Sequence, residues 1–294
     1  IHKMPDLCYS RNASNDFLTS DQIRARAPAV YAHDYAEDLS TKYGNFNSAN
    51  AIEVMSDYGY GVTQAAQVKG RSEKANIYGQ HLMAFAKRHE INALSEQQPE
   101  IIFYNSHDGK SSMKLFAGIY RFVCSNGIIA GEGFDQRMVH YKSNLDSFED
   151  LLTYTAAKLE GVTDFTRKLQ RIIPDEQTVN RFAKQALSTR YDYFANVNNG
   201  RPPIESLVTN MFDARAVQQA LAVTRREDMA DDAWTIFNRV QESVLRGGFH
   251  VLGPRKRHTR RYIGYKEAKA ITSVKESVTI NRKLWDIAQE TLAA

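Results

Sequence analysis

Between residues 50 and 143, short apolar runs alternate with polar, turn-prone segments, and this pattern predicts an antiparallel β-sheet. Strands are predicted at residues 60–69, 80–88, 100–104, 113–124, 128–131 and 138–142. A short helix at 51–58 precedes them, and the polar segment 70–79 is predicted to be a mobile loop between the first two strands. Asn126-Gly127 predicts a type I′ hairpin turn, because both residues tolerate the positive φ angles that this turn needs.

After Asp146 the apolar residues recur every three to four positions, which predicts a long amphipathic helix that ends before Pro174. Further helices are predicted at residues 179–187, 228–245 and 278–292, with a Tyr- and Asn-rich loop after the first and Gly247-Gly248 ending the second. The fold class is therefore α+β: an antiparallel β-meander (about 50–143) backed by a long helix and a helical C-terminal half.

Residues 1–17 show no periodicity and are predicted to be a flexible tail, after which Thr19-x-x-Gln22 has the form of a helix capping box. A single α+β domain is predicted over 18–294, sheet-rich at 50–143 and helical at 144–294, with a basic loop at 246–269. No apolar run reaches the roughly 18 residues of a membrane span, so we expect a cytoplasmic protein without membrane contact. The two cysteines form no metal motif, and neither a metal nor a cofactor is expected.

The formal net charge is only +4, so the distribution of charge is more informative than its sum. Cations concentrate between residues 254 and 262, where almost no side chain is suited to a core. They are Arg255, Lys256, Arg257, Arg260 and Arg261. A segment of this composition stays solvated or binds an anion, and we expect it to bind a polyanion such as nucleic acid.

The turn Asn105-Ser106-His107-Asp108, followed by Gly109, is the most polar stretch inside the predicted sheet. It permits a structural interpretation, in which Asn105 and Asp108 bond backbone amides and Gly109 supplies a positive φ. It also permits a ligand or nucleic-acid contact at an exposed tip. A third interpretation is catalysis, with His107 beside Asp108 as a general base or as part of a metal site completed by Glu132 and His140.

Basic and aromatic residues interleave along the predicted strands, a combination typical of surfaces that bind single-stranded nucleic acid. The cations are Lys87, Arg88, Lys110, Lys114, Arg121 and Lys142, and the nearby rings include Phe103, Tyr104, Tyr120 and Tyr141. Half-buried strands of ordinary sheets show the same mixture, so a purely structural role is the alternative. The chain contains no glycine-rich phosphate loop, Gly-x-Ser-x-Gly elbow or His-Glu-x-x-His motif. Nucleotide hydrolysis, serine hydrolase chemistry and zinc-protease chemistry therefore have no support in the sequence.

Several motifs stand in an order that resembles a known family. They are Pro99-Glu-Ile101, Asn105-Ser-His-Asp-Gly109, Gly118, Arg121, Cys124, Asn126-Gly127, Arg225-Arg-Glu-Asp228, Trp234, Arg239-Val-Gln-Glu242, Gly247-Gly248, Asn281-Arg282 and Leu284-Trp285. From about Leu18 to the C-terminus the chain resembles the phage/plasmid-like protein family of unknown function, of the YafZ, YfjQ and YubP type. The resemblance implies a protein carried by phages, prophages or plasmids, and it supplies no catalytic residues.

The leading hypothesis is a non-enzymatic, mobile-element protein that binds or anneals single-stranded DNA as a homo-oligomer. The predicted sheet backed by a long helix is similar in architecture to single-strand annealing proteins such as RecT and Redβ, which is an analogy of fold only. One alternative is a counter-defence protein that binds and inhibits a host immune or restriction protein. A weaker alternative is a metal-dependent nuclease at His107, Asp108, Glu132 and His140.

Overall fold

The computed structural model of the chain divides into two compact units, Ile1–Thr163 and Asp164–Ala294, and each is taken by itself below. The described residues are 16–33, 36, 46–67, 72–88, 97–109, 111–121, 126–129, 137–138, 145–199, 214–224, 226–252, 265–271 and 274–293. The boundary between the units falls inside the long helix α4 (Leu145–Leu169), so this helix contributes to both. The prediction of a single domain over 18–294 stays a prediction.

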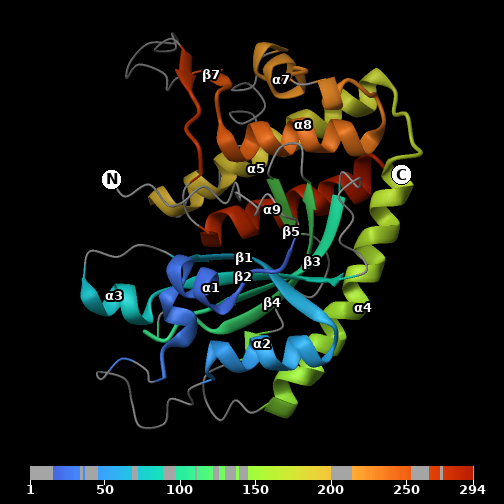
Figure 1. The fold of residues 1–294 in the computed structure, drawn as a ribbon. Helices are drawn as coiled ribbons and strands as arrows, with labels where there is room; N and C mark the ends of the chain where they lie inside the picture. Colours follow the sequence, from blue (N-terminus) through green and yellow to red (C-terminus); the bar gives the residue numbers. More distant parts are fainter. Residues whose placement is uncertain are drawn as a thin grey trace. The chain divides into compact units, whose positions relative to one another are not determined.

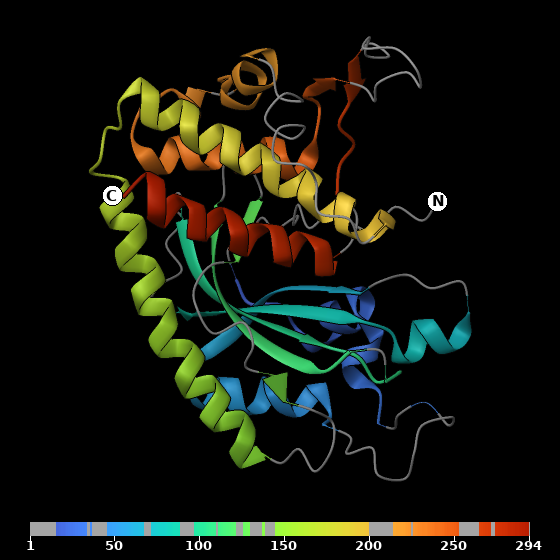
Figure 2. The ribbon, with the colours of Figure 1, turned by 180° about the vertical axis from the view of Figure 1, so that it is seen from behind.

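The first unit contains the predicted antiparallel sheet (Figures 1 and 2). Its strands are β1 (Tyr60–Gln67), β2 (His81–Lys87), β3 (Gln97–Asn105), β4 (Met113–Arg121), β5 (Asn126–Ile129) and β6 (Arg137–Met138). The first five pair in sequence order, and β6 adds to β4. The α+β fold class and the meander are confirmed.

One face of this sheet carries the larger apolar side chains. Met83 pairs with Phe103, and Phe85 pairs with Ile101, so these four side chains point to the same face. The ring of Phe103 lies 6.1 Å from that of Phe148 in α4, and Phe148 lies 5.0 Å from Phe46, which comes just before α2 (Ser48–Asp57). Alternating strand residues and the apolar stripe of the first part of α4 therefore build one core.

The hairpin of β4 and β5 is confirmed, but the predicted position of its turn is wrong. Arg121 pairs with Asn126, and Tyr120 pairs with Gly127, so Asn126-Gly127 belongs to the strand itself. Residues 122–125, between the two strands, lie outside the described residues. An Asn-Gly dipeptide favours a turn locally, but here strand pairing determines its conformation.

The segment that precedes β1 and the connection between β1 and β2 are ordered by side-chain contacts. The capping box at Thr19 and Gln22 is confirmed, and it opens α1 (Ser20–Arg26), which the short helix η1 (Pro28–Tyr31) follows. The predicted mobile loop at 70–79 instead contains α3 (Glu73–Tyr78). The Gln67 amide accepts a hydrogen bond from the Ala29 N–H and donates one to the Asn76 carbonyl, which ties α3 to η1.

The second unit is mainly helical. After the end of α4 it contains α5 (Glu176–Asn199), α7 (Ala214–Leu221), η3 (Arg226–Asp228), α8 (Ala233–Arg246) and α9 (Val274–Thr291), with a two-stranded sheet of β7 (His250–Leu252) and β8 (Tyr265–Glu267). Its core is aromatic. Phe237 of α8 lies 6.0 Å from Phe182 of α5, 5.9 Å from Trp285 of α9 and 5.8 Å from Trp234, all measured between ring centroids.

Three predictions for this unit are wrong in their boundaries. Helix α5 continues to Asn199 through the first part of the segment predicted to be a Tyr- and Asn-rich loop, and residues 200–203 of that segment lie outside the described residues. Helix α8 begins at Ala233 and not at Asp228, because the Asp232 carboxylate accepts a hydrogen bond from the Thr235 N–H and caps the helix there. The predicted basic loop at 246–269 includes both β7 and β8, so its two ends are paired strands. In the described part of the chain, no helix is long and apolar enough to cross a membrane.

Candidate nucleic-acid interface

The polar turn after β3 is anchored in a buried cluster of the first unit. Asn105, Ser106 and His107 are all 0% exposed, so the expectation of an exposed tip is wrong for these side chains. The hydroxyl of Ser48, the first residue of α2, lies at the centre of the cluster. Its Oγ lies 2.7 Å from His81 Nε2, 3.2 Å from His107 Nε2 and 3.0 Å from Asn105 Nδ2.

The hydrogen-bond geometry constrains the donors and acceptors of this cluster. His81 Nδ1 lies 3.0 Å from the Gly79 carbonyl oxygen and donates to it, so a His81 ring that is neutral accepts from the Ser48 hydroxyl at Nε2. In that tautomer Ser48 accepts from the Asn105 amide and from His107 Nε2 with its two lone pairs. The two imidazole rings stack with their centroids 5.2 Å apart. One hydroxyl thus connects α2, β2 and the end of β3.

The outer part of the same turn is closed by two serines. The Ser111 N–H donates to Ser106 Oγ at 3.1 Å, and Ser111 Oγ lies 3.1 Å from the Tyr104 hydroxyl. Gly109 has a φ of +73°, which confirms the positive φ expected there. Burial raises the pKa of the Tyr104 hydroxyl, against the lowering effect of its hydrogen bond to Ser111, and nearby Asp108 raises it further.

These contacts favour a structural role of the turn over a catalytic one, but the predicted bond from Asn105 to a backbone amide is wrong. Its Nδ2 donates to Ser48 Oγ, and its Oδ1 has no hydrogen-bond partner among the described residues. Because His107 is fully buried and its Nε2 faces Ser48, it does not present a base to a substrate at the surface. Glu132 and His140, the proposed completing ligands, lie outside the described residues. Over the described part of the chain, no group of three or more His, Cys, Asp or Glu side chains is arranged to hold a metal ion.

Of the cations predicted along the sheet, the three whose side chains the structure describes do not gather at one place. Lys114 pairs with Tyr104, next to the polar turn, whereas Lys87 and Arg88 lie at the opposite end of β2. The Lys87 ammonium lies 5.3 Å from the ring of Tyr60, and Arg88 lies over Phe17 and within 3.7 Å of Asp16. Arg121 is described only by its backbone, and Lys110 and Lys142 lie outside the described residues.

The aromatic residues that were expected to accompany these cations belong largely to the core. Phe103 is 0% exposed and Tyr104 is 8% exposed, so neither presents a ring face to a nucleic-acid base. The side chain of Tyr120 is not described, and Tyr141 lies outside the described residues. The two described rings are therefore accounted for by burial within the sheet.

The second unit offers a different basic surface, the hairpin of β7 and β8. Three antiparallel pairs join its strands: His250 with Glu267, Val251 with Lys266, and Leu252 with Tyr265. The five predicted cations Arg255, Lys256, Arg257, Arg260 and Arg261 lie between these strands in sequence and outside the described residues. Since the strands are paired, both ends of the basic segment are held side by side.

Two glycines attach this hairpin to the end of α8. Gly247, the C-cap of α8, has φ 78° and ψ −146°, a conformation essentially confined to glycine. A Cβ atom on Gly247 would lie 2.1 Å from the carbonyl oxygen of Ala268, so the two segments meet at backbone contact distance. Gly248 has a φ of +87° and donates its N–H to that same carbonyl at 2.8 Å.

Side chains from α5 and α7 complete the anchor. Gln219 of α7 accepts the His250 N–H at 2.8 Å, and its Nε2 lies 3.2 Å from His250 Nδ1. The buried guanidinium of Arg190 in α5 donates to the Val244 carbonyl at 2.8 Å and lies 5.7 Å from the Phe249 ring centroid. Burial raises the pKa of the Glu276 carboxyl, and the positive charge of Arg190 opposes that shift.

Cations and an aromatic ring lie on the outside of this anchored hairpin. Tyr265 is 49% exposed, and the exposed Arg215 of α7 places its guanidinium 5.2 Å from the ring centroid. Lys266 and Lys269 are exposed as well. The sequence analysis missed Tyr265 and Arg215, because they lie 50 residues apart in the chain and neither belongs to a recognisable motif.

Comparison with known proteins places the chain in a family. Residues 19–285 match the family described as "Domain of unknown function (DUF932)", and the chain belongs to that family. It is 26% identical to the UPF0380 protein YfjQ of Escherichia coli (strain K12), over 94% of this chain and 92% of the relative. It is 27% identical to the UPF0380 protein YafZ of the same organism, with the same shares covered. No solved structure matches the chain.

Removing the Ser48 hydroxyl should destabilise the first unit. Ser48→Ala leaves up to three buried polar groups without their shared partner, so we expect the free energy of unfolding to fall by about 2–5 kcal/mol. Ser56→Ala is the matched control, because Ser56 is exposed on the same helix and should change stability by less than about 0.5 kcal/mol. Urea denaturation measures both. Equal stability of the two variants would contradict the central role of Ser48.

The two glycines of the hairpin anchor should respond differently to alanine. Gly248→Ala meets no atom within 4 Å, so it should cost only about 1–2 kcal/mol for its positive φ. Gly247→Ala adds a collision with the Ala268 backbone, and its cost should be larger by at least about 1 kcal/mol. The comparison uses the urea midpoints of the two variants. A Gly247→Ala protein as stable as Gly248→Ala would show that the close approach is not a constraint.

Proposed function

We propose that this member of the DUF932 family binds nucleic acid, with single-stranded DNA as its target, through the β7–β8 hairpin. The observation that carries the proposal is the exposed pair of Tyr265 and Arg215 at the base of a hairpin whose connecting segment is strongly basic. The protein acts by holding the strand and not by chemical conversion of it.

Charge supports the binding of a polyanion at this place. Residues 253–264 contain five Lys or Arg side chains and no acidic residue. At the base of the hairpin, Lys266 and Lys269 are exposed, and Lys266 points to the opposite face of β8 from Tyr265. Glu267 is the acidic residue of β8, and it pairs with His250. This density of cations in the sequence suits the regularly spaced phosphates of a nucleic-acid strand.

The exposed ring favours a single strand over a duplex. Bases in a duplex are stacked on one another, whereas an unpaired base can stack on an aromatic side chain and gains about 1–3 kcal/mol. The Arg215 guanidinium beside the Tyr265 ring supplies a cation next to the stacking position, where a phosphate would follow the base. Tyr265 would thus bind a base while the neighbouring cations bind the backbone.

The basic segment should contribute through charge alone. Replacing Arg255, Lys256, Arg257, Arg260 and Arg261 by Ala removes up to five phosphate contacts, and each full contact contributes about 0.7 to the slope of log affinity against log salt concentration. We expect weaker binding of a labelled oligonucleotide at low salt and a shallower slope, with an unchanged melting temperature. An unchanged affinity and slope would exclude this segment as the contact.

Tyr265 should contribute through stacking. Tyr265→Ala should weaken the binding of single-stranded oligonucleotide by about 1–3 kcal/mol, which is roughly 5- to 150-fold, with little effect on duplex binding. Tyr154→Ala is the matched control, because Tyr154 is 39% exposed and has the Lys158 ammonium 5.6 Å from its ring, but lies on α4. Fluorescence anisotropy measures both variants. Equal losses, or none, would contradict a specific role for Tyr265.

A further inference from the structure

The second unit contains an open pocket that the nucleic-acid proposal does not use. It has a volume of about 890 Å³ and lies among α5, α7, the start of α8 and the residues that follow α4. Apolar side chains form much of its wall: Val179, Val217, Leu221 and Ile236. The volume falls within the range of about 300–1,000 Å³ that is typical of sites for small organic ligands.

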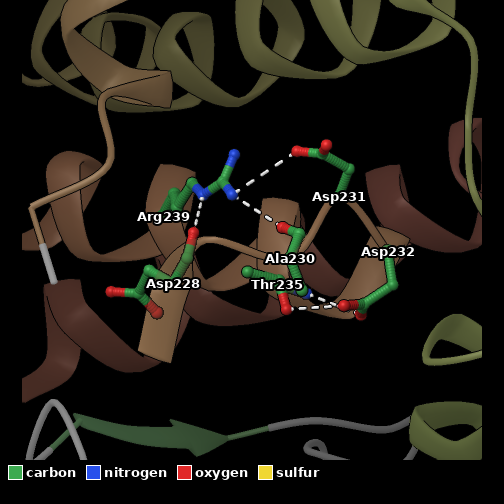
Figure 3. Close-up of polar contacts among 6 residues, drawn as sticks. All are labelled: Asp228, Ala230, Asp231, Asp232, Thr235 and Arg239. Atoms are coloured by element: carbon green, nitrogen blue, oxygen red, sulfur yellow. Dashed lines mark hydrogen bonds and ion pairs between the residues drawn. The ribbon is translucent and has the colours of Figure 1, made fainter. Parts of the chain in front are cut away.

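A buried cation lines this pocket. The side chain of Arg239 is only 8% exposed, and backbone carbonyls hold its guanidinium in place (Figure 3). Its Nε donates to the Asp228 carbonyl at 2.7 Å, and its Nη2 donates to the Ala230 carbonyl at 2.6 Å. These contacts fix the plane of the guanidinium before any ligand binds, which reduces the entropy lost on binding.

One nitrogen of this guanidinium remains available. Figure 3 shows Nη1 of Arg239 directed away from the Asp228 and Ala230 carbonyls, and no hydrogen-bond acceptor meets it among the residues that the structure describes. Nη1 carries two N–H donors, which suit an oxygen of a carboxylate or phosphate. A buried Arg with two anchored nitrogens and one available nitrogen is therefore suited to bind an oxyanion.

Other charges at the pocket do not cancel this preference. The carboxylates of Glu176 and Asp231 also line it, but both residues are exposed, and the Asp231 carboxylate, which is 82% exposed, lies 3.7 Å from Arg239 Nη2. Water screens such charges more strongly than it screens a buried guanidinium. The exposed Lys184 adds a second cation on the α5 side of the pocket.

We propose that this pocket binds a small organic oxyanion, a carboxylate or phosphate group carried on an apolar or aromatic body. The oxyanion accepts hydrogen bonds from Arg239 Nη1 and is attracted by Lys184, while the body lies against Val179 and Val217. Nothing in the site breaks a bond of the ligand, so the pocket acts in binding only. The site is separate from the hairpin of β7 and β8.

Two probes with uncharged counterparts test the proposal. Thymidine 5′-monophosphate is compared with thymidine, and 4-phenylbutyrate with 4-phenylbutanamide, by isothermal titration and ligand-observed NMR on the full chain. We expect at least one anion to bind about tenfold or more tightly than its uncharged counterpart, as a charge-assisted hydrogen bond implies. The probe that binds more tightly identifies phosphate or carboxylate as the preferred group. Equal binding of anions and uncharged counterparts, or no binding at millimolar concentration, would overturn the proposal.

Variants then locate the site. Lys184→Ala should weaken the preferred anion about 2- to 5-fold, and Val179→Trp, which fills the pocket, should remove binding. Arg181→Ala is the matched control, because Arg181 is exposed one turn away on α5 and does not line the pocket. Arg239 is left unchanged, since it also anchors the segment before α8. Full binding of the probe by Val179→Trp would overturn the site. The variant with alanine at the five cations between β7 and β8 should bind the probe as the parent does, whether or not the hairpin binds DNA, so the two proposals can fail independently.

Discussion

The requirement that buried polar groups form hydrogen bonds determines how the irregular segments of both units are held. In each unit, polar side chains on helices or strands reach the backbone or side chains of a turn or of a short neighbouring element. Ser48 holds the polar turn after β3, and Gln67 holds α3 against η1. In the helical unit, Gln219 holds the start of β7, and Arg239 holds residues 228–230. The apolar cores place the helices and strands, and these contacts place the segments between them.

The same contacts explain which elements the sequence could predict. Strands β1 to β4 are short apolar runs buried on both faces, and helices α4, α8 and α9 carry apolar residues at helical spacing, so both patterns are visible in the sequence. Helix α3 is short and polar, and its position depends on Gln67, which lies outside it. The hairpin of β7 and β8 has only three residues in each strand, too few for a recognisable alternation, and its position depends on two glycines and on Gln219.

For the candidate sites, the sequence indicated charge and composition but not burial. Asn105, Ser106 and His107 form a polar turn in a chain position typical of surface loops, and the sequence contains no indication that Ser48 would bury them. The basic segment between β7 and β8 was recognisable because charge density is a property of the sequence itself. The contact between the Tyr265 ring and Arg215 could not be recognised in the sequence, because it exists only after α7 packs next to the hairpin.

Several residues from the motifs that pointed to the family are points of attachment in this structure. Asn105 and His107 meet at Ser48, Arg239 fixes the segment before α8, and Gly247 allows α8 to end against Ala268. The position of the β7–β8 hairpin likewise follows from an anchor made of Gly247, Gly248, Gln219 and Arg190, each of which acts on the backbone or on Phe249 and His250.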